Sequence, residues 1–240
     1  MLGWWRRLRR RRFQQAAFPQ QWLLYLQEEA PFYAQLSAEQ QFKLQRHILA
    51  FVHEKVFIGA QGFEITPRVQ VIIAAAAGRL VLGLDMSFYD RLTEIVVYAG
   101  DYTHADKDGI VMGEAHTWGT VVLSWDAVQR GLQNPDDGHD TALHEFAHVL
   151  DVAGGSFDGT PQLRADEHYR VWGEVMSQHF LRLRKRGPHR RALLRQYGAT
   201  NEAEFFAVAT EAFFEKPEQM QEKAPQLFEE LSRFYGLRPS

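Results

Sequence analysis

Apolar residues recur along most of the chain at the spacing of helices. Spacings of three and four predict helices across residues 19–57, and Ser37-Ala38-Glu39-Gln40 resembles a capping box that opens the longer one. Another helix is predicted to begin at Thr66-Pro67, with Thr as N-cap and Pro at the first helical position. Residues 71–84 are apolar on nearly every face, which indicates a helix in the centre of the core.

Strands are predicted only in short segments of the first half of the chain. Residues 92–98 and 118–125 are rich in β-branched and aromatic residues, and residues 63–65 predict a shorter strand. Further helices are predicted downstream, where Gly and Pro residues mark the stops: residues 165–186, 190–196, 201–214 with Thr200 as cap, and 217–235. The pattern therefore predicts an α+β fold that is mostly helical.

Residues 144–148 read His-Glu-Phe-Ala-His, the HExxH pattern, within a segment predicted to be helical. Residues four apart on a helix project from the same face. His144 and His148 can therefore bind one Zn²⁺, and Glu145 can act as general base toward a metal-bound water. The flanking apolar residues are enough to bury the helix. The pattern predicts a zinc-dependent hydrolase, most often a peptidase, and a buried structural pair of His is the alternative.

A catalytic zinc keeps three protein ligands and one open position for water. The chain has no Cys, and position 154 is Gly where a metzincin has its third His, so a carboxylate from a later helix is expected. Glu204 and Glu211 stand seven residues apart in an apolar helical segment, so they share one face and both need a partner. Asp151 shares the face of the two His and can orient a ligand imidazole. Glu211 is a second candidate for that orienting role.

Three segments together resemble the Mlc titration factor A family of bacterial zinc metallopeptidases: HEFAHVLD at 144–151, VVLSW at 121–125 and EFFAVATEAFF at 204–214. The resemblance extends from about residue 19 to residue 235, and the active site of this family is similar to that of the anthrax lethal factor catalytic domain. It implies a zincin-like arrangement, with a small β-sheet packed on the HExxH active-site helix and further C-terminal helices.

The resemblance also implies roles for individual residues. The ligands of one zinc per chain would be His144, His148 and Glu204, with Glu145 as base. In the family a Tyr precedes the third ligand by seven residues, and Tyr197 stands seven residues before Glu204. Tyr197 is then implied to donate its phenol to the developing oxyanion.

Two functions follow as hypotheses from this resemblance. The first is a peptidase acting on a peptide substrate, in its narrower form an aminopeptidase. The second is a regulatory protein that binds a transcriptional repressor of the Mlc type, the partner from which the family takes its name. Glu145 favours the first hypothesis, because a protein that only binds has no need of a general base.

Length and composition set the remaining expectations. With 240 residues, we expect a disordered Arg-rich tail at 1–18 and a single domain at 19–236, with an N-terminal helical part at 19–60 and a catalytic core at 61–236. The net charge of −3 gives no reason to expect nucleic-acid binding, although the tail, with Trp4 and Trp5, could touch anionic lipid or nucleic acid. The absence of Cys fits a cytoplasmic protein. The chain has no apolar run of about 18 residues, so we expect no transmembrane segment.

Overall fold

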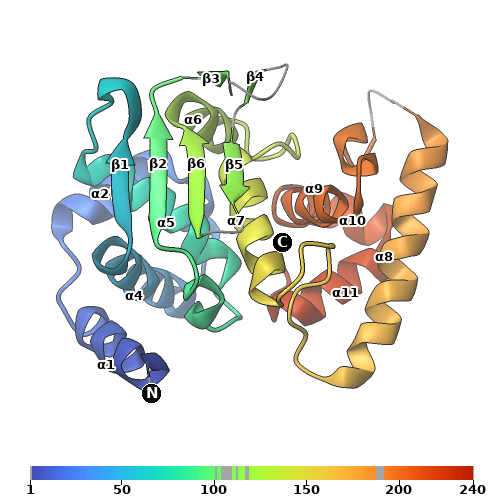
Figure 1. Ribbon diagram of the computed structural model, residues 1–240, viewed down its shortest axis with the longest axis horizontal. Helices are drawn as coiled ribbons and strands as arrows, with labels where there is room; N and C mark the ends of the chain where they lie inside the picture. The colour runs from blue at the N-terminus through green and yellow to red at the C-terminus, as the bar shows by residue number, and fades with distance from the viewer. Residues whose placement is uncertain are drawn as a thin grey trace.

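The computed structural model describes residues 2–100, 102–103, 110–111, 113–116, 119–187 and 192–239. For residues 2–7, 102–103, 110–111 and 113–116 it describes the backbone alone. A small sheet lies on one side of the molecule and is backed by helices, while the C-terminal helices form the other side (Figure 1). The helix that carries the HExxH pattern lies between the two sides (Figure 1). The predicted fold class, mostly helical with a small sheet against this helix, is confirmed.

The main sheet has four strands in the order β1 (Val56–Gly59), β2 (Glu94–Tyr98), β6 (Thr120–Ser124) and β5 (Gly113–His116). The first three are parallel, and β5 runs antiparallel to β6. A second sheet pairs β3 (Tyr102–Thr103) with β4 (Ile110–Val111). Every second residue of β2 and β6 is fully buried, because alternate residues of a strand point to the same face.

The strand predicted at residues 63–65 is wrong. The first strand is instead Val56–Gly59, and the chain then turns through the 3-10 helix η1 (Ala60–Gly62), where Gln61 has a φ of 52°. Residues 63–65 follow this turn and are not part of a strand. The predicted strands at 92–98 and 118–125 contain β2 and β6.

The helices that back the sheet begin where the sequence predicts. Helix α4 (Ala38–Glu54) opens with a capping box, in which Ser37 Oγ accepts from Gln40 N at 3.2 Å and Gln40 Oε1 accepts from Ser37 N at 2.9 Å. Helix α5 (Pro67–Leu80) is capped by Thr66 and is buried throughout residues 71–80. The short helices α2 (Gln20–Glu29) and α3 (Pro31–Gln35) precede them, and η2 (Met86–Tyr89) follows.

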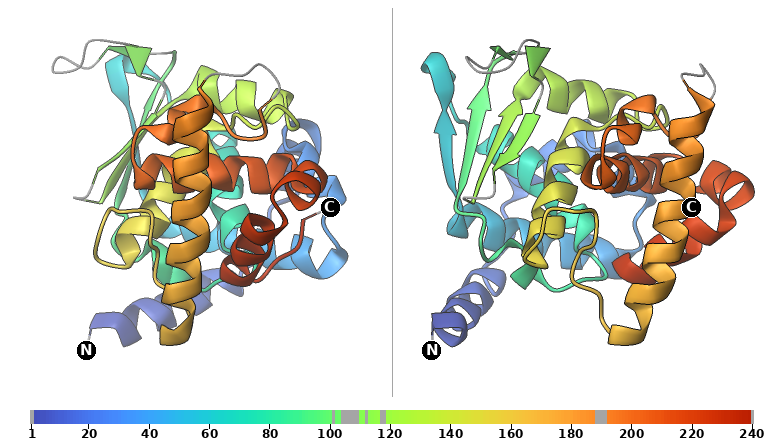
Figure 2. Two further views of the ribbon diagram at one scale, coloured as in Figure 1. Left: turned by 90° about the vertical axis from the view of Figure 1, so that its right-hand side faces the viewer. Right: turned by 45° about the vertical axis from the view of Figure 1, so that its right-hand side comes forward.

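The second half of the chain is helical: α6 (Trp125–Gln133), α7 (Thr141–Ala153), α8 (Asp166–Arg186), η3 (Gln196–Ala199), α9 (Glu202–Glu215), α10 (Pro217–Lys223) and α11 (Pro225–Tyr235). Figure 2 shows α8 beside α9 and α11, on the side away from the sheet. One predicted helix at 217–235 is wrong, because Pro225 lacks an N–H and the chain restarts there as α11.

Two further details of the C-terminal half differ from the predictions. In the predicted helix at 190–196, residues 192–195 are not helical, and Gln196 begins the 3-10 helix η3. Helix α9 is capped by Asn201 rather than by Thr200, since Asn201 Oδ1 accepts from Glu204 N at 2.9 Å.

The N-terminal segment forms helix α1 (Leu2–Gln14), where disorder was predicted for residues 1–18. Arg10 is 7% exposed and donates to Glu54 (2.9 and 2.8 Å) and to Asp90 (2.7 Å), which ties α1 to α4. The sequence gives no sign of these partners, which lie 44 and 80 residues away. The division of residues 19–236 at residue 60 stays a prediction, and β1 pairs with β2 across that boundary.

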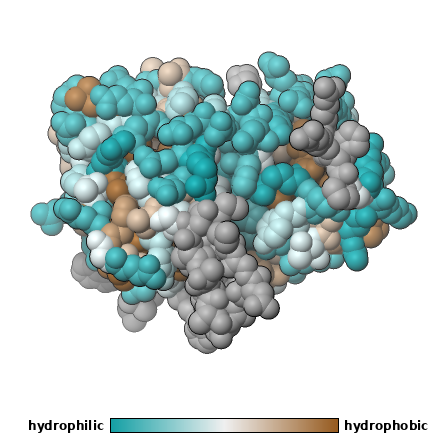
Figure 3. Space-filling view, turned by 90° about the horizontal axis from the view of Figure 1, so that it is seen from above, coloured by the Kyte–Doolittle hydropathy of each residue, from teal (hydrophilic) through white to brown (hydrophobic). Residues whose placement is uncertain are grey.

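The surface agrees with the polar composition. Seen from above, the described part of the surface is mostly hydrophilic, with scattered hydrophobic patches (Figure 3). Within the described residues, no helix is both long and apolar enough to cross a membrane.

Candidate metal centre

Helix α7 is the foundation of the site, because it is buried on nearly all sides. It begins at Asp140, whose Oδ1 accepts from Leu143 N at 2.9 Å. Five of its apolar residues are at most 1% exposed: Ala142, Leu143, Phe146, Ala147 and Leu150. His144, Glu145 and His148 are buried with them, at 6%, 5% and 4% exposure. Buried polar side chains of this kind need partners, and helix α9 supplies them.

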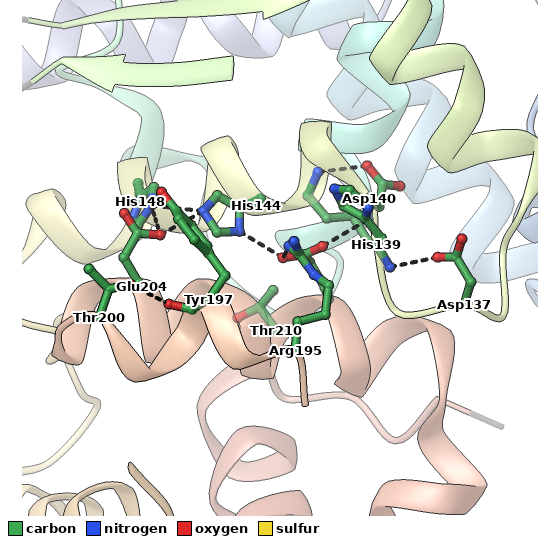
Figure 4. A network of polar contacts seen from close by, with 12 residues as sticks. Asp137, His139, Asp140, His144, His148, Arg195, Tyr197, Thr200, Glu204 and Thr210 are labelled. Carbon is green, nitrogen blue, oxygen red and sulfur yellow. Dashed lines mark hydrogen bonds and ion pairs between the residues drawn. The ribbon is translucent and has the colours of Figure 1, made fainter. Parts of the chain in front are cut away.

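Three potential ligand atoms meet between α7 and α9 (Figure 4). Glu204 Oε2 lies 2.9 Å from His144 Nε2 and 3.4 Å from His148 Nε2, and the two Nε2 atoms lie 3.2 Å apart. In the described part of the chain, this is the one group of three or more His, Cys, Asp or Glu that can hold a metal ion, with all ligand atoms within 4.8 Å. Two imidazole nitrogens and a carboxylate oxygen suit zinc.

Glu211 lies outside this group and contacts its first imidazole from behind. Its Oε1 accepts from His144 Nδ1 at 2.7 Å, and its Oε2 accepts from Asp140 N at 2.9 Å. Arg195 also donates to Oε1, and the Glu211 side chain is fully buried. With its Nδ1 proton directed at Glu211, His144 presents Nε2 toward Glu204 and His148.

The carboxylates make the site favourable for positive charge. Burial lowers the pKa of His144, but Glu211 and Glu204 outweigh it and raise this pKa to about 10. Burial raises the pKa of Glu204, but its hydrogen bonds with His144 and His148 hold it well below its ordinary value. Burial lowers the pKa of His148. These charges suit a metal cation bound by the same atoms.

Tyr197 lies beside the same group, and the charge of Glu145 acts on it. The Tyr197 ring, on η3, lies 5.8 Å from the His144 ring and is 52% exposed. Burial, together with the charges of Glu204 and Glu145, raises the pKa of Tyr197 to about 12, so its phenol keeps its proton near neutral pH. Glu145 also contributes to the raised pKa of His144. The roles of Tyr197 as oxyanion donor and of Glu145 as base stay predictions.

Asp151 is fully buried at the end of α7, but its hydrogen bond leads away from the imidazoles. Its Oδ2 accepts from Gly159 N at 2.9 Å and so holds the loop that follows α7. Its Oδ1 and His148 Nδ1 are both buried without a hydrogen-bond partner. Orientation of His148 by Asp151 stays a prediction.

Two residues contact the site although no sequence motif identifies them. Arg195 pairs with Glu211, and no motif marks it apart from its place two residues before Tyr197. Phe157, on the loop after α7, lies 4.9 Å from the His148 ring and is 43% exposed. An apolar side chain in a loop that is half exposed next to a potential ligand gives no periodic signal in a sequence.

An HExxH helix joined by a carboxylate from a later helix defines a metallopeptidase type of site. Residues 4–236 match the family described as glucose-regulated metallo-peptidase M90, and the chain belongs to this family. An uncharacterised protein of Synechocystis sp. is 36% identical over 248 residues, covering 98% of this chain and 90% of its own length. Mlc titration factor A of Yersinia pestis is 28% identical over 224 residues, covering 87% and 82%. The family resemblance drawn from the sequence is confirmed.

A second group of buried acids lies behind Glu211, around the start of α7 and the end of α9. Glu215 is 6% exposed, and its Oε2 has no hydrogen-bond partner. Burial, followed by the charge of Asp140, raises the pKa of Glu215 to about 8, and burial raises that of Asp140 to about 6. Arg79 offsets part of this charge and lies over the rings of Phe32 (4.5 Å) and Phe214 (5.2 Å).

We expect Glu211→Gln to weaken metal binding, because a neutral amide polarises His144 less than a carboxylate does. Affinity should fall roughly 10- to 100-fold, the usual effect of losing such an outer partner. The measurement is a titration against a chelator of known affinity. Glu202→Gln, an exposed change on the same helix, is the control and should leave affinity unchanged. Equal affinity for the two variants would contradict the role of Glu211.

We also expect Glu215→Gln to change how stability depends on pH. The unfolded chain loses this proton near pH 4.5 and the folded protein near pH 8, so wild-type stability falls between these values as pH rises. A permanently neutral Gln does not undergo this loss of stability, and the variant should be more stable than wild type by on the order of 4 kcal/mol at pH 8.

Urea unfolding from pH 4 to pH 8 measures this difference. The exposed change Glu222→Gln is the control and should follow wild type throughout. A stability difference between Glu215→Gln and wild type that stays constant with pH would show that Glu215 does not titrate as described.

Proposed function

We propose that this metallopeptidase is a zinc-dependent peptidase, with one zinc per chain bound by His144, His148 and Glu204. The observation that carries the proposal is the convergence of two Nε2 atoms and one carboxylate oxygen within 4.8 Å. Three protein ligands leave a fourth position for water, as in catalytic rather than structural zinc sites. The negative charges of Glu204 and Glu211 around the imidazoles support a divalent cation at this place.

Each side chain around the site has a separate role in hydrolysis. Zinc bound here would lower the pKa of its water and polarise the scissile carbonyl. Glu145 accepts a proton from the attacking water and passes it to the leaving amine. Tyr197, whose phenol stays protonated, donates to the oxygen on which negative charge develops. Glu211 keeps His144 in the tautomer and orientation that present Nε2.

The edge strand of the main sheet suits a peptide in extended conformation. Strand β6 is paired on both sides, by β2 and β5, whereas β5 is the last strand of this sheet among the described residues and lies beside α7 (Figure 1). We place the substrate along β5, with main-chain hydrogen bonds as in strand addition. Cleavage at the amino end of the peptide, in the cytoplasm, is the narrower form of this proposal.

Zinc content and hydrolysis of a fluorogenic peptide library, measured on the same preparations, test the proposal. Wild type and Glu145→Gln should each hold one zinc, but the variant should lose roughly 10²–10⁴-fold in kcat, because it lacks the base. Glu204→Ala should lose zinc and activity together, whereas the exposed change Glu202→Ala on the same helix should keep both. Full zinc content in Glu204→Ala would overturn the ligand assignment, and full activity of Glu145→Gln would overturn its role as base.

Binding of a repressor of the Mlc type is a second candidate function. Its support is the similarity over 87% of the chain to proteins named Mlc titration factor A. The Glu145→Gln variant separates the two functions, since loss of the base abolishes hydrolysis but leaves a docking surface intact.

Phe157 is placed to contact the substrate side chain next to the scissile bond. Its ring packs against His148 at 4.9 Å and remains 43% exposed, so it presents apolar surface at the edge of the site. Gly159, which accepts from Trp172 Nε1 and donates to Asp151, holds the loop in place. We therefore propose that Phe157 favours substrates with a large apolar side chain at that position.

Phe157→Ala should lower kcat/KM roughly tenfold for peptides with a large apolar residue beside the scissile bond, and much less for peptides with Ala there. Zinc content should not change. The control is Phe42→Ala, which changes an exposed Phe elsewhere, on α4, and should leave kcat/KM for both substrates unchanged. An equal loss with both substrates would assign Phe157 a structural role instead.

A further inference from the structure

Helix α1 carries a concentrated positive charge. Residues 1–18 contain six arginines and no acidic residue or lysine, and the whole chain has a net charge of −3, so the remaining residues carry a net charge of −9. This local excess of positive charge attracts an anionic partner to α1.

The contacts of α1 fix which of its faces points outward. Arg10 binds Glu54 and Asp90, the Phe13 ring stacks on that of His53 at 4.7 Å, and Arg46 donates to the carbonyl oxygens of Gln14 and Ala16. The C-terminal half of α1 is thus held against the domain through one face. Its N-terminal end extends away from the other elements in all views (Figures 1 and 2).

The opposite face combines apolar and basic positions. At 100° per residue, positions 4, 5, 8 and 12 fall on the side of the helix away from Arg10, and positions 9 and 11 fall on its two flanks. Leu8 is 41% exposed, and Arg9, Arg11 and Arg12 are exposed as well. Positions 4 and 5 are Trp. The outward helix positions are therefore those of Trp4, Trp5 and Leu8, and the exposed Arg9, Arg11 and Arg12 lie beside or among them.

We propose that this outward face of α1 binds an anionic membrane surface. Arginines attract the lipid headgroups, while Trp and Leu enter the boundary between headgroups and acyl chains. Nucleic acid would use the arginines but has no need of an apolar row between them. The metal centre lies between α7 and α9, away from α1, so a docked membrane leaves the site accessible (Figure 1).

Co-sedimentation of the full chain with vesicles tests the proposal. Wild type should bind vesicles of phosphatidylcholine with phosphatidylglycerol, and bind vesicles of phosphatidylcholine alone far less. The double change Arg11→Glu and Arg12→Glu should lower the partition coefficient roughly tenfold or more. Lys185→Glu with Arg186→Glu, the same charge change at the exposed end of α8, is the matched control and should bind like wild type.

A second variant separates a membrane from other anions. Trp4→Ala with Trp5→Ala leaves the charge unchanged, and it should also lose most of its binding to anionic vesicles. Equal partition of wild type into neutral and anionic vesicles would overturn the proposal. Vesicle binding that survives the Trp changes would overturn it too, as would an arginine-dependent affinity for duplex DNA without vesicle binding.

Discussion

The buried carboxylate of Glu211 is the interaction on which the site depends. Its side chain is fully buried between α7 and α9, where an unpaired charge would be strongly destabilising. Three donors satisfy it: Nδ1 of His144, the backbone N–H of Asp140 and the guanidinium of Arg195. The same bonds join the start of α7, the ligand imidazole and the segment before η3. Satisfaction of one buried charge therefore also fixes the orientation of His144.

Packing on both sides of α7 keeps this arrangement rigid. On the sheet side, the Phe146 ring meets the rings of Phe51 and Tyr89, each at 5.8 Å and nearly perpendicular. On the C-terminal side, Trp172 and Phe206 pack together at 5.9 Å beneath α9. Close-packed aromatic rings leave little room for either helix to shift. Ligands contributed by two different helices can then stay within bonding distance of one another.

The sequence predicts features that depend on neighbouring residues, but it does not predict contacts between distant segments. The Ser37 capping box and the Thr66 cap depend on residues three apart, so the sequence alone predicts them. The apolar spacing continues through Pro225, so the pattern predicts one helix where the structure has two, although the cause of the break is local. The order of α1 could not be foreseen, since it depends on Arg10 reaching Asp90, 80 residues away. Seven-residue spacing put Glu204 and Glu211 on one face but could not tell which of them meets both imidazoles.

The separation of roles between Glu204 and Glu211 also determines how a proton competes with a metal. The two carboxylates raise the pKa of His144 to about 10, so near neutral pH this imidazole holds a proton as long as no other cation is present. A metal ion bound to Nε2 must displace that proton, and binding therefore becomes tighter as pH rises. Glu204, with a pKa far below its ordinary value, stays ionised throughout this range. The negative charge of Glu204 and Glu211 thus both attracts a metal to the site and raises the pKa of His144.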